Sequence, residues 1–193
     1  MELVFENEEQ VITSHKAKRF LVWLFVGSST IMFGGWTSYY LVFMASKGKG
    51  HGLVLPEAFQ YSTLVLIASS ILLFLAGKAL KNNNIIKHRS LLILTFLFGV
   101  LFGVLQYYGW ISLYRTGAVL VNNNAAISMI YIISGMHLLH ILGGLIIISF
   151  GISGNLSRLP MATLKFRQDV AAIFWHFIDL LWVYLYIFLL FSN

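Results

Sequence analysis

The chain consists of long apolar stretches separated by short polar ones. A helix needs roughly 20 apolar residues to cross the hydrocarbon core of a bilayer. Three stretches of at least that length contain no histidine and no charged residue: Phe20–Ser46, Ala58–Gly77 and Ser90–Tyr114. None of them shows the period-2 alternation of a membrane β-strand, so each predicts a transmembrane helix.

Two further apolar stretches each contain one pair of ionisable side chains. His137 and His140 interrupt the fourth stretch, and His176 and Asp179 interrupt the fifth. The sequence therefore predicts an all-α, polytopic transmembrane bundle of five helices, forming a single membrane domain over residues 1–193. The expected spans are approximately 20–45, 58–80, 89–114, 125–153 and 169–192.

Composition narrows the chemistry that the chain can carry. Of 193 residues, 59% are hydrophobic and 10% charged, against about 25% charged in a soluble domain, which supports a lipid-facing surface. The absence of cysteine excludes thiolate-bound haem, iron–sulfur clusters and a cysteine-bridged copper centre. The net charge of +6 is dispersed at the predicted helix ends, so no nucleic-acid partner is expected.

The distribution of basic residues predicts an orientation. With the N-terminus in the cytoplasm, ten of the 13 lysines and arginines fall in cytoplasmic segments. Only Lys47, Lys49 and Arg115 fall in outer segments. This positive-inside bias predicts a cytoplasmic N-terminus and a periplasmic C-terminus.

The four ionisable side chains in the last two spans are the candidate site. Burying such a group in the bilayer costs a few kcal/mol on insertion scales, so each needs a partner. His137 and His140 are three residues apart, as are His176 and Asp179, so each pair lies on one side of its helix. We expect a histidine of the fourth helix to donate to the Asp179 carboxylate, forming a polar lock between the two helices.

Three other interpretations of these residues stay open. Histidines on facing helices could ligate a haem, although the repeated histidine pairs usual in b-type cytochromes are absent. Three histidines and a carboxylate also match the ligand preferences of zinc and copper. A proton relay is chemically feasible because histidine titrates near neutrality, yet nothing in the sequence continues such a chain to either surface.

Two segments in the last two helices resemble a known family. The fifth helix reads Asp169-Val170-Ala171-Ala172-Ile173-Phe174-Trp175-His176-Phe177-Ile178-Asp179-Leu180-Leu181-Trp182. This string resembles the signature of haem-copper oxidase subunit III, an acidic residue and two alanines followed by aromatic-Trp-His-Phe-x-Asp-x-x-Trp. The fourth helix contains Gly135-Met136-His137-Leu138-Leu139-His140, similar to the family's Gly-x-His-x-x-His segment.

Weaker similarity covers the third helix, and two positions depart from the family. The family tends to have the same residues at Arg89, Thr95, Gly99, Phe102 and Gln106. It usually places an intramembrane glutamate where Ser29 stands, and a second acidic residue where Gly109 stands. The chain resembles the bacterial five-helix form of the family, which lacks the first two helices of the seven-helix form.

The resemblance implies an accessory subunit without redox cofactors in a proton-pumping terminal oxidase of the bacterial cytoplasmic (inner) membrane. Cytochrome c oxidase is the expected complex; a quinol oxidase and an independent haem b cytochrome are the alternatives. The subunit would stabilise subunit I, bind phospholipid and support proton uptake and oxygen access. Haems and copper are expected in partner subunits.

The resemblance also implies partners and residue roles. Subunit I is the expected direct partner, and subunit II, a small subunit IV and a respiratory supercomplex are further candidates. The resemblance assigns Trp175 and Trp182 to helix packing. The family signature also includes Gly135 and Asp169.

Overall fold

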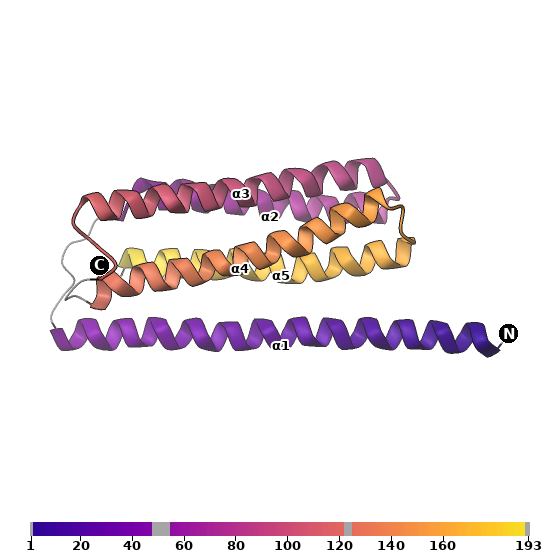
Figure 1. The fold of residues 1–193 in the computed structure, drawn as a ribbon, viewed down its shortest axis with the longest axis horizontal. Coiled ribbons are helices and arrows are strands. Elements are labelled where there is room, and N and C mark those ends of the chain that lie inside the picture. The colour runs from indigo at the N-terminus through magenta and orange to yellow at the C-terminus, as the bar shows by residue number, and fades with distance from the viewer. Residues whose placement is uncertain (1, 48–54, 122–124, 192–193) are drawn as a thin grey trace.

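The computed structural model describes residues 2–47, 55–121 and 125–191, with side chains described for 13–44, 55–121 and 127–191. Within these residues the chain is helical and contains no strand (Figure 1). The five helices are α1 (Glu2–Lys47), α2 (Glu57–Lys81), α3 (Ile85–Arg115), α4 (Ala125–Leu156) and α5 (Met161–Phe191). The all-α prediction is confirmed. Lys49, used to predict the orientation, lies outside the described residues.

Four helices form a bundle and α1 lies along one side of it (Figure 1). In the bundle, α2 packs against α3 and α5, and α4 packs against the same two helices. Among the described residues, α1 contacts only α4 and α5. The first two helices along the chain are therefore not neighbours in space.

Polar residues and prolines set the helix ends. The last turn of α2 contains Lys78 and Lys81, and Asn83 follows with a φ of 57°, a left-handed conformation that asparagine tolerates. Asn84 then caps α3, its side-chain oxygen accepting from the Lys87 backbone N–H at 3.0 Å. This asparagine turn reverses the chain within three residues and places α2 and α3 side by side.

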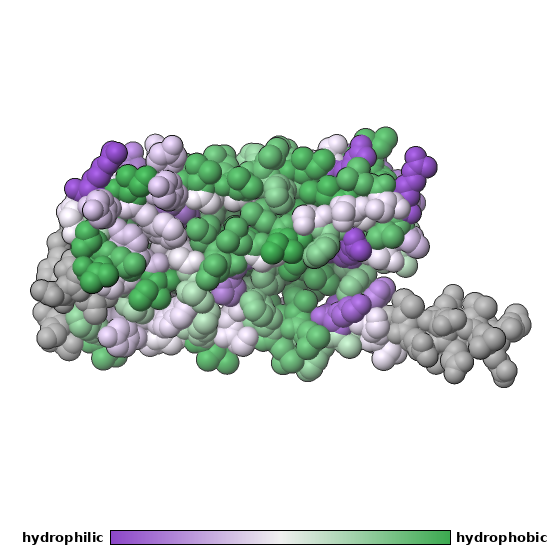
Figure 2. Space-filling model, in the orientation of Figure 1, coloured by the Kyte–Doolittle hydropathy of each residue, from purple (hydrophilic) through white to green (hydrophobic). Residues whose placement is uncertain are grey.

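Five helices are long and apolar enough to cross a membrane, which confirms the predicted number. They extend beyond the predicted spans: α1 begins at Glu2, and α5 begins at Met161 directly after Pro160. A helix does not have to end where the hydrocarbon ends, and proline is tolerated just before or within a first turn. Apolar side chains cover the middle of the surface and hydrophilic ones lie near the ends (Figure 2).

The bundle core is built around the indole of Trp175, which is fully buried. A Cβ atom added at Gly99 on α3 or at Gly144 on α4 would come within 2.7 Å of this ring. Both glycines therefore make room for this ring, Gly99 on α3 and Gly144 on α4. The Trp175 Nε1–H donates to Ser69 of α2 at 3.0 Å, so this side chain contacts all three neighbouring helices.

Candidate functional site

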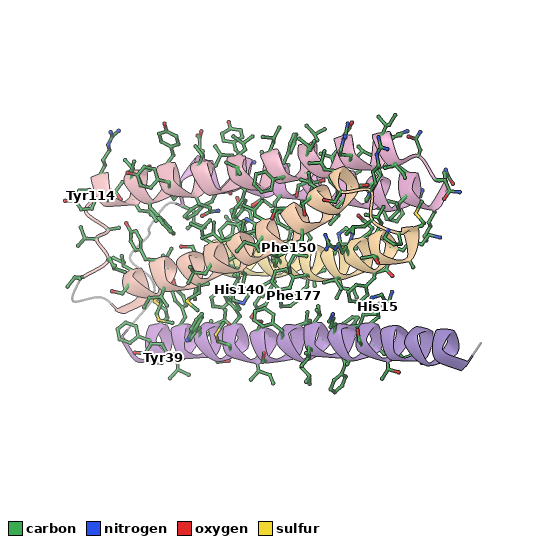
Figure 3. All side chains as sticks on the ribbon, turned by 45° about the vertical axis from the view of Figure 1, so that its right-hand side comes forward. His15, Tyr39, Tyr114, His140, Phe150 and Phe177 are labelled. Atoms are coloured by element: carbon green, nitrogen blue, oxygen red, sulfur yellow. The ribbon has the colours of Figure 1, made fainter. Side chains whose placement is uncertain are left out.

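His140 joins α4 to α1. Its Nδ1 lies 2.8 Å from the Met136 carbonyl oxygen, which can only accept, so Nδ1 donates. Its Nε2 lies 3.1 Å from the Ser29 hydroxyl of α1, which donates to it when the ring is neutral. Figure 3 shows His140 between the two helices. Both ring nitrogens are therefore used.

Ser29, the position where the family pattern has a glutamate, is thus the partner of His140. The sequence marked Ser29 as a departure but did not connect it to His140, 111 residues away. Phe25 and Phe33 pack against the imidazole with ring centroids 5.5 and 5.3 Å away. A neutral hydroxyl, enclosed by aromatic rings, replaces the carboxylate of the family pattern.

His137 lies one turn away in a different environment. Its side chain is fully buried, and neither ring nitrogen has a hydrogen-bond partner among the described residues. The rings of Phe102 and Trp182 pack against it, with centroids 5.6 and 4.9 Å away. The imidazole behaves as a packed ring in the bundle core.

The second ionisable pair faces α2. His176 Nδ1 lies 2.6 Å from the Ser70 hydroxyl of α2 and 4.0 Å from Asp179 Oδ2 on its own helix. Asp179 is buried, and its hydrogen-bonding neighbour is the same Ser70 hydroxyl. The structure brings Ser70, His176 and Asp179 together as one cluster.

This arrangement corrects the predicted lock, in which a histidine of the fourth helix donates to Asp179. Neither His137 nor His140 forms a hydrogen bond or ion pair with Asp179; the two imidazoles contact the core and α1 instead. Spacing along a helix fixes the angle between two of its side chains but leaves the rotation of that helix against its neighbours undetermined. The rotation found here turns Asp179 toward α2.

Sequence reasoning missed a further buried histidine, His88. His88 Nδ1 lies 3.1 Å from Asn155 Oδ1, and its Nε2 lies 3.0 Å from Gln168 Oε1. The amide nitrogens donate in turn to the carbonyl oxygens of Gly151 and Leu73. The network connects α2 through α5. The three side chains lie one or two residues outside the predicted spans 89–114, 125–153 and 169–192, and this shared position was the available signal.

Buried hydroxyls connect α2 to the signature tryptophans. Trp182 Nε1–H donates to Thr63 at 2.9 Å, as Trp175 donates to Ser69. Gln106 of α3 donates to Ser62 of α2 at 3.0 Å. Trp175 and Trp182, predicted as packing residues, also hold α2 through hydrogen bonds, which the sequence did not predict.

The remaining pattern residues lie farther from the cluster. Asp169 of α5 is half exposed and pairs with Arg19 of α1. Gly135 has the Trp110 ring as its nearest side chain, 3.9 Å from an added Cβ. An added Cβ at Gly109 would lie 2.6 Å from Phe59, so no acidic side chain fits there without moving that ring.

No three histidine, cysteine, aspartate or glutamate side chains gather closely enough to hold a metal ion in the part of the chain with described side chains. The four candidate residues are divided among different contacts. His140 faces α1, His137 lies in the core, and His176 and Asp179 face α2. Two of them, His140 and His176, form hydrogen bonds to other helices.

Comparison with known proteins agrees with the family resemblance of the fourth and fifth helices. The family model for cytochrome c oxidase subunit III matches residues 10–193. A Mycobacterium bovis protein named "Probable cytochrome c oxidase subunit 3" is 32% identical, covering 86% of this chain and 82% of its own length. Cytochrome c oxidase subunit 3 of Bacillus subtilis is 30% identical, covering 93% and 88%. Cytochrome bo(3) ubiquinol oxidase subunit 3 of Buchnera aphidicola is 27% identical, covering 86% and 87%.

Proposed function

Because the chain belongs to the cytochrome c oxidase subunit III family, we propose that it is an accessory subunit, without redox cofactors of its own, in a proton-pumping cytochrome c oxidase. The family match over nearly the whole chain carries this proposal. Haems and copper would belong to partner subunits, with subunit I as the direct partner. The chain would stabilise that partner and support proton uptake and oxygen access.

The surroundings of the histidines support a role without redox cofactors. His140 and His88 use both ring nitrogens in hydrogen bonds within the chain. His137 is enclosed by the rings of Phe102 and Trp182. An iron or copper ion would have to break these contacts to reach a ring nitrogen of any of the three.

The proposed location is the bacterial cytoplasmic membrane, with the N-terminus in the cytoplasm. The start of α1, the α2–α3 turn and the α4–α5 turn lie at the same end of the molecule (Figure 1). Ten of the 13 lysines and arginines belong to these segments. The positive-inside rule favours that end on the cytoplasmic side.

A bound phospholipid is part of the proposal. A groove of about 370 Å³ between α3 and α4 is lined mainly by apolar side chains, and Gly99, Gly103, Tyr107 and Tyr108 are among its lining residues. The glycines leave room between the helices, and tyrosine rings favour the interface between lipid and water. An acyl chain fits such a groove without leaving a polar group unpaired.

Purification through a tag on this chain tests the proposal. Membranes of the native host, solubilised in mild detergent, should yield the chain together with a haem-bearing subunit I and a copper-binding subunit II. The chain, once separated from that complex, should show no haem absorption. Stoichiometric haem on the separated chain would overturn the accessory role in favour of a small haem b cytochrome.

The same preparation tests a second candidate, a quinol oxidase. The similarity to the Buchnera aphidicola protein, which is named as a ubiquinol oxidase subunit, supports the quinol oxidase as a second candidate. Mass spectrometry of the copurified subunit II distinguishes the two complexes, because a dinuclear copper centre for cytochrome c requires cysteine ligands. A subunit II without such cysteines, in a preparation that oxidises quinol, would favour the quinol oxidase.

A further inference from the structure

His176 lies where an unpaired polar group is costly. It is fifteen residues from Met161 and fifteen from Phe191, at the midpoint of α5. Its side chain is 39% exposed, on the surface that a membrane would cover. Only Nδ1 has a hydrogen-bond partner, the Ser70 hydroxyl, which leaves Nε2 unpaired in the described part of the chain.

The carboxyl group behind His176 depends on the same hydroxyl. The Asp179 side chain is 8% exposed, and its hydrogen-bonding neighbour is the Ser70 hydroxyl, which also contacts His176 Nδ1. Its nearest ionic partner is His176 Nδ1, at 4.0 Å. Polar groups buried in a membrane protein are normally paired with one another or with a neighbour. The cluster is therefore incomplete in the single chain.

The cluster opens onto a defined face of α5. This helix turns one side to α1 through Phe174 and Tyr184, and another side to α2 through Trp175 and Trp182. The face between them is the outward face of α5, formed by Ile173, His176, Leu180, Val183 and Ile187. These residues recur at helical spacing, and Leu180 is 73% exposed.

Two helices, α1 and α2, flank this face. Among the described residues α1 and α2 do not contact each other, and both pack against α5. A helix that packs on the outward face of α5 would therefore also meet α1 or α2. An acyl chain could cover Leu180 and Ile187, but it cannot form a hydrogen bond with His176.

We propose that the outward face of α5 receives a transmembrane helix of another subunit, which places a hydroxyl or amide side chain against His176 Nε2 within the bilayer. Either group can donate or accept, so it suits both tautomers of His176. Small and polar side chains are the usual contacts between helices in membranes, because apolar packing alone does not distinguish protein from lipid. This inference rests on the proposed function, since it requires a multi-subunit complex.

The natural absence of cysteine makes the test direct. Leu180→Cys, labelled with a photoactivatable maleimide in the tag-purified complex, should form an adduct with a transmembrane peptide of another subunit. That peptide should carry a hydroxyl or amide side chain within one turn of the attachment point. Leu101→Cys on α3, exposed and distant from the outward face of α5, is the matched control.

Substitution of His176 tests the hydrogen bond itself. His176→Leu should lower the Leu180 adduct about 3- to 10-fold, the range expected for one hydrogen bond between helices in a membrane. His176→Gln, which keeps a donor and an acceptor, should retain the adduct. The Leu101 adduct, whatever its partner, should be the same in all three backgrounds, which excludes general misfolding as the cause.

Three results would overturn the inference. They are a Leu180 adduct with lipid alone, an adduct with a second copy of this chain, or equal adduct yields with histidine and leucine at position 176. Failure of the proposed function is separate: the tagged chain would then purify without any haem-bearing subunit, before crosslinking begins. A complex that copurifies normally while Leu180 reaches only lipid rejects this inference alone.

Discussion

The glycines of α1 and those of the four-helix bundle lie in opposite surroundings. A Cβ atom added at Gly27, Gly34 or Gly35 of α1 would meet nothing within 4 Å. At Gly99 and Gly144 in the bundle, it would lie within 2.7 Å of Trp175. The bundle is thus held by close backbone approach, and α1 does not use its glycines for packing within this chain.

Spaced polar contacts hold α1 instead. Arg19 pairs with Asp169, and Ser29 contacts His140. The Thr37 hydroxyl lies 2.9 Å from that of Tyr184. Both ways of joining helices occur in membranes, because van der Waals packing and hydrogen bonds remain when the hydrophobic effect no longer distinguishes lipid from protein. Side-chain loss should therefore weaken the two regions by different amounts.

The largest effect is expected at the centre of the bundle. Trp175→Ala should lower the free energy of unfolding by about 3–5 kcal/mol, because it leaves a cavity where three helices meet. The effect is measured by heating the purified complex and monitoring the loss of this subunit from it. Trp175→Phe keeps most of the ring but loses the bond to Ser69, so its cost should be clearly smaller. Equal costs would mean that the hydrogen bond dominates over packing.

Two glycine-to-alanine substitutions, one in the bundle and one in α1, test the difference between these two regions. Gly144→Ala should cost about 1–3 kcal/mol, because the new methyl group forces the Trp175 ring to move. Gly27→Ala should be neutral or stabilise by up to about 1 kcal/mol, since alanine is the better helix former and nothing obstructs it. Thermal stability of the two variants in the complex gives the answer. A costly Gly27→Ala would show that a partner subunit packs on that glycine.

A smaller effect is expected where α1 meets α4. Ser29→Ala should weaken the attachment of α1 by about 0.6 kcal/mol, the average measured for a hydrogen bond between membrane helices. A disulfide introduced between α1 and α4 near this site should then form more slowly. Ser28→Ala is the control, because the Ser28 hydroxyl bonds only to the Phe25 carbonyl oxygen of its own helix. An equal response to both substitutions would reject the role of the Ser29–His140 contact.

The smallest effect is expected at the exposed ion pair. Arg19→Ala should cost about 0.2–1 kcal/mol at low salt, because both side chains are about half exposed. The cost should decrease as salt is added, since exposed charges are screened. Stability measured at two ionic strengths tests this. A cost independent of salt would indicate that Arg19 contributes mainly through its contact with the Phe166 ring.

The sequence by itself determined the number of helices and the family. Charge-free stretches can be counted along the chain, and the bilayer requires helices wherever such stretches are long enough. The signature around Trp175 and His176 could also be recognised, because a motif within one helix depends only on the order of residues along the chain. The resemblance based on it is confirmed by the family match.

Only the tertiary structure decided which polar groups meet. The sequence paired a histidine of the fourth helix with Asp179, whereas the folded chain pairs His140 with Ser29 and places Asp179 near His176. It also gave no indication that His88 joins Asn155 and Gln168. Helical spacing fixes side-chain directions within one helix, but the rotation and neighbours of each helix follow from packing, here from the fit of glycines around Trp175.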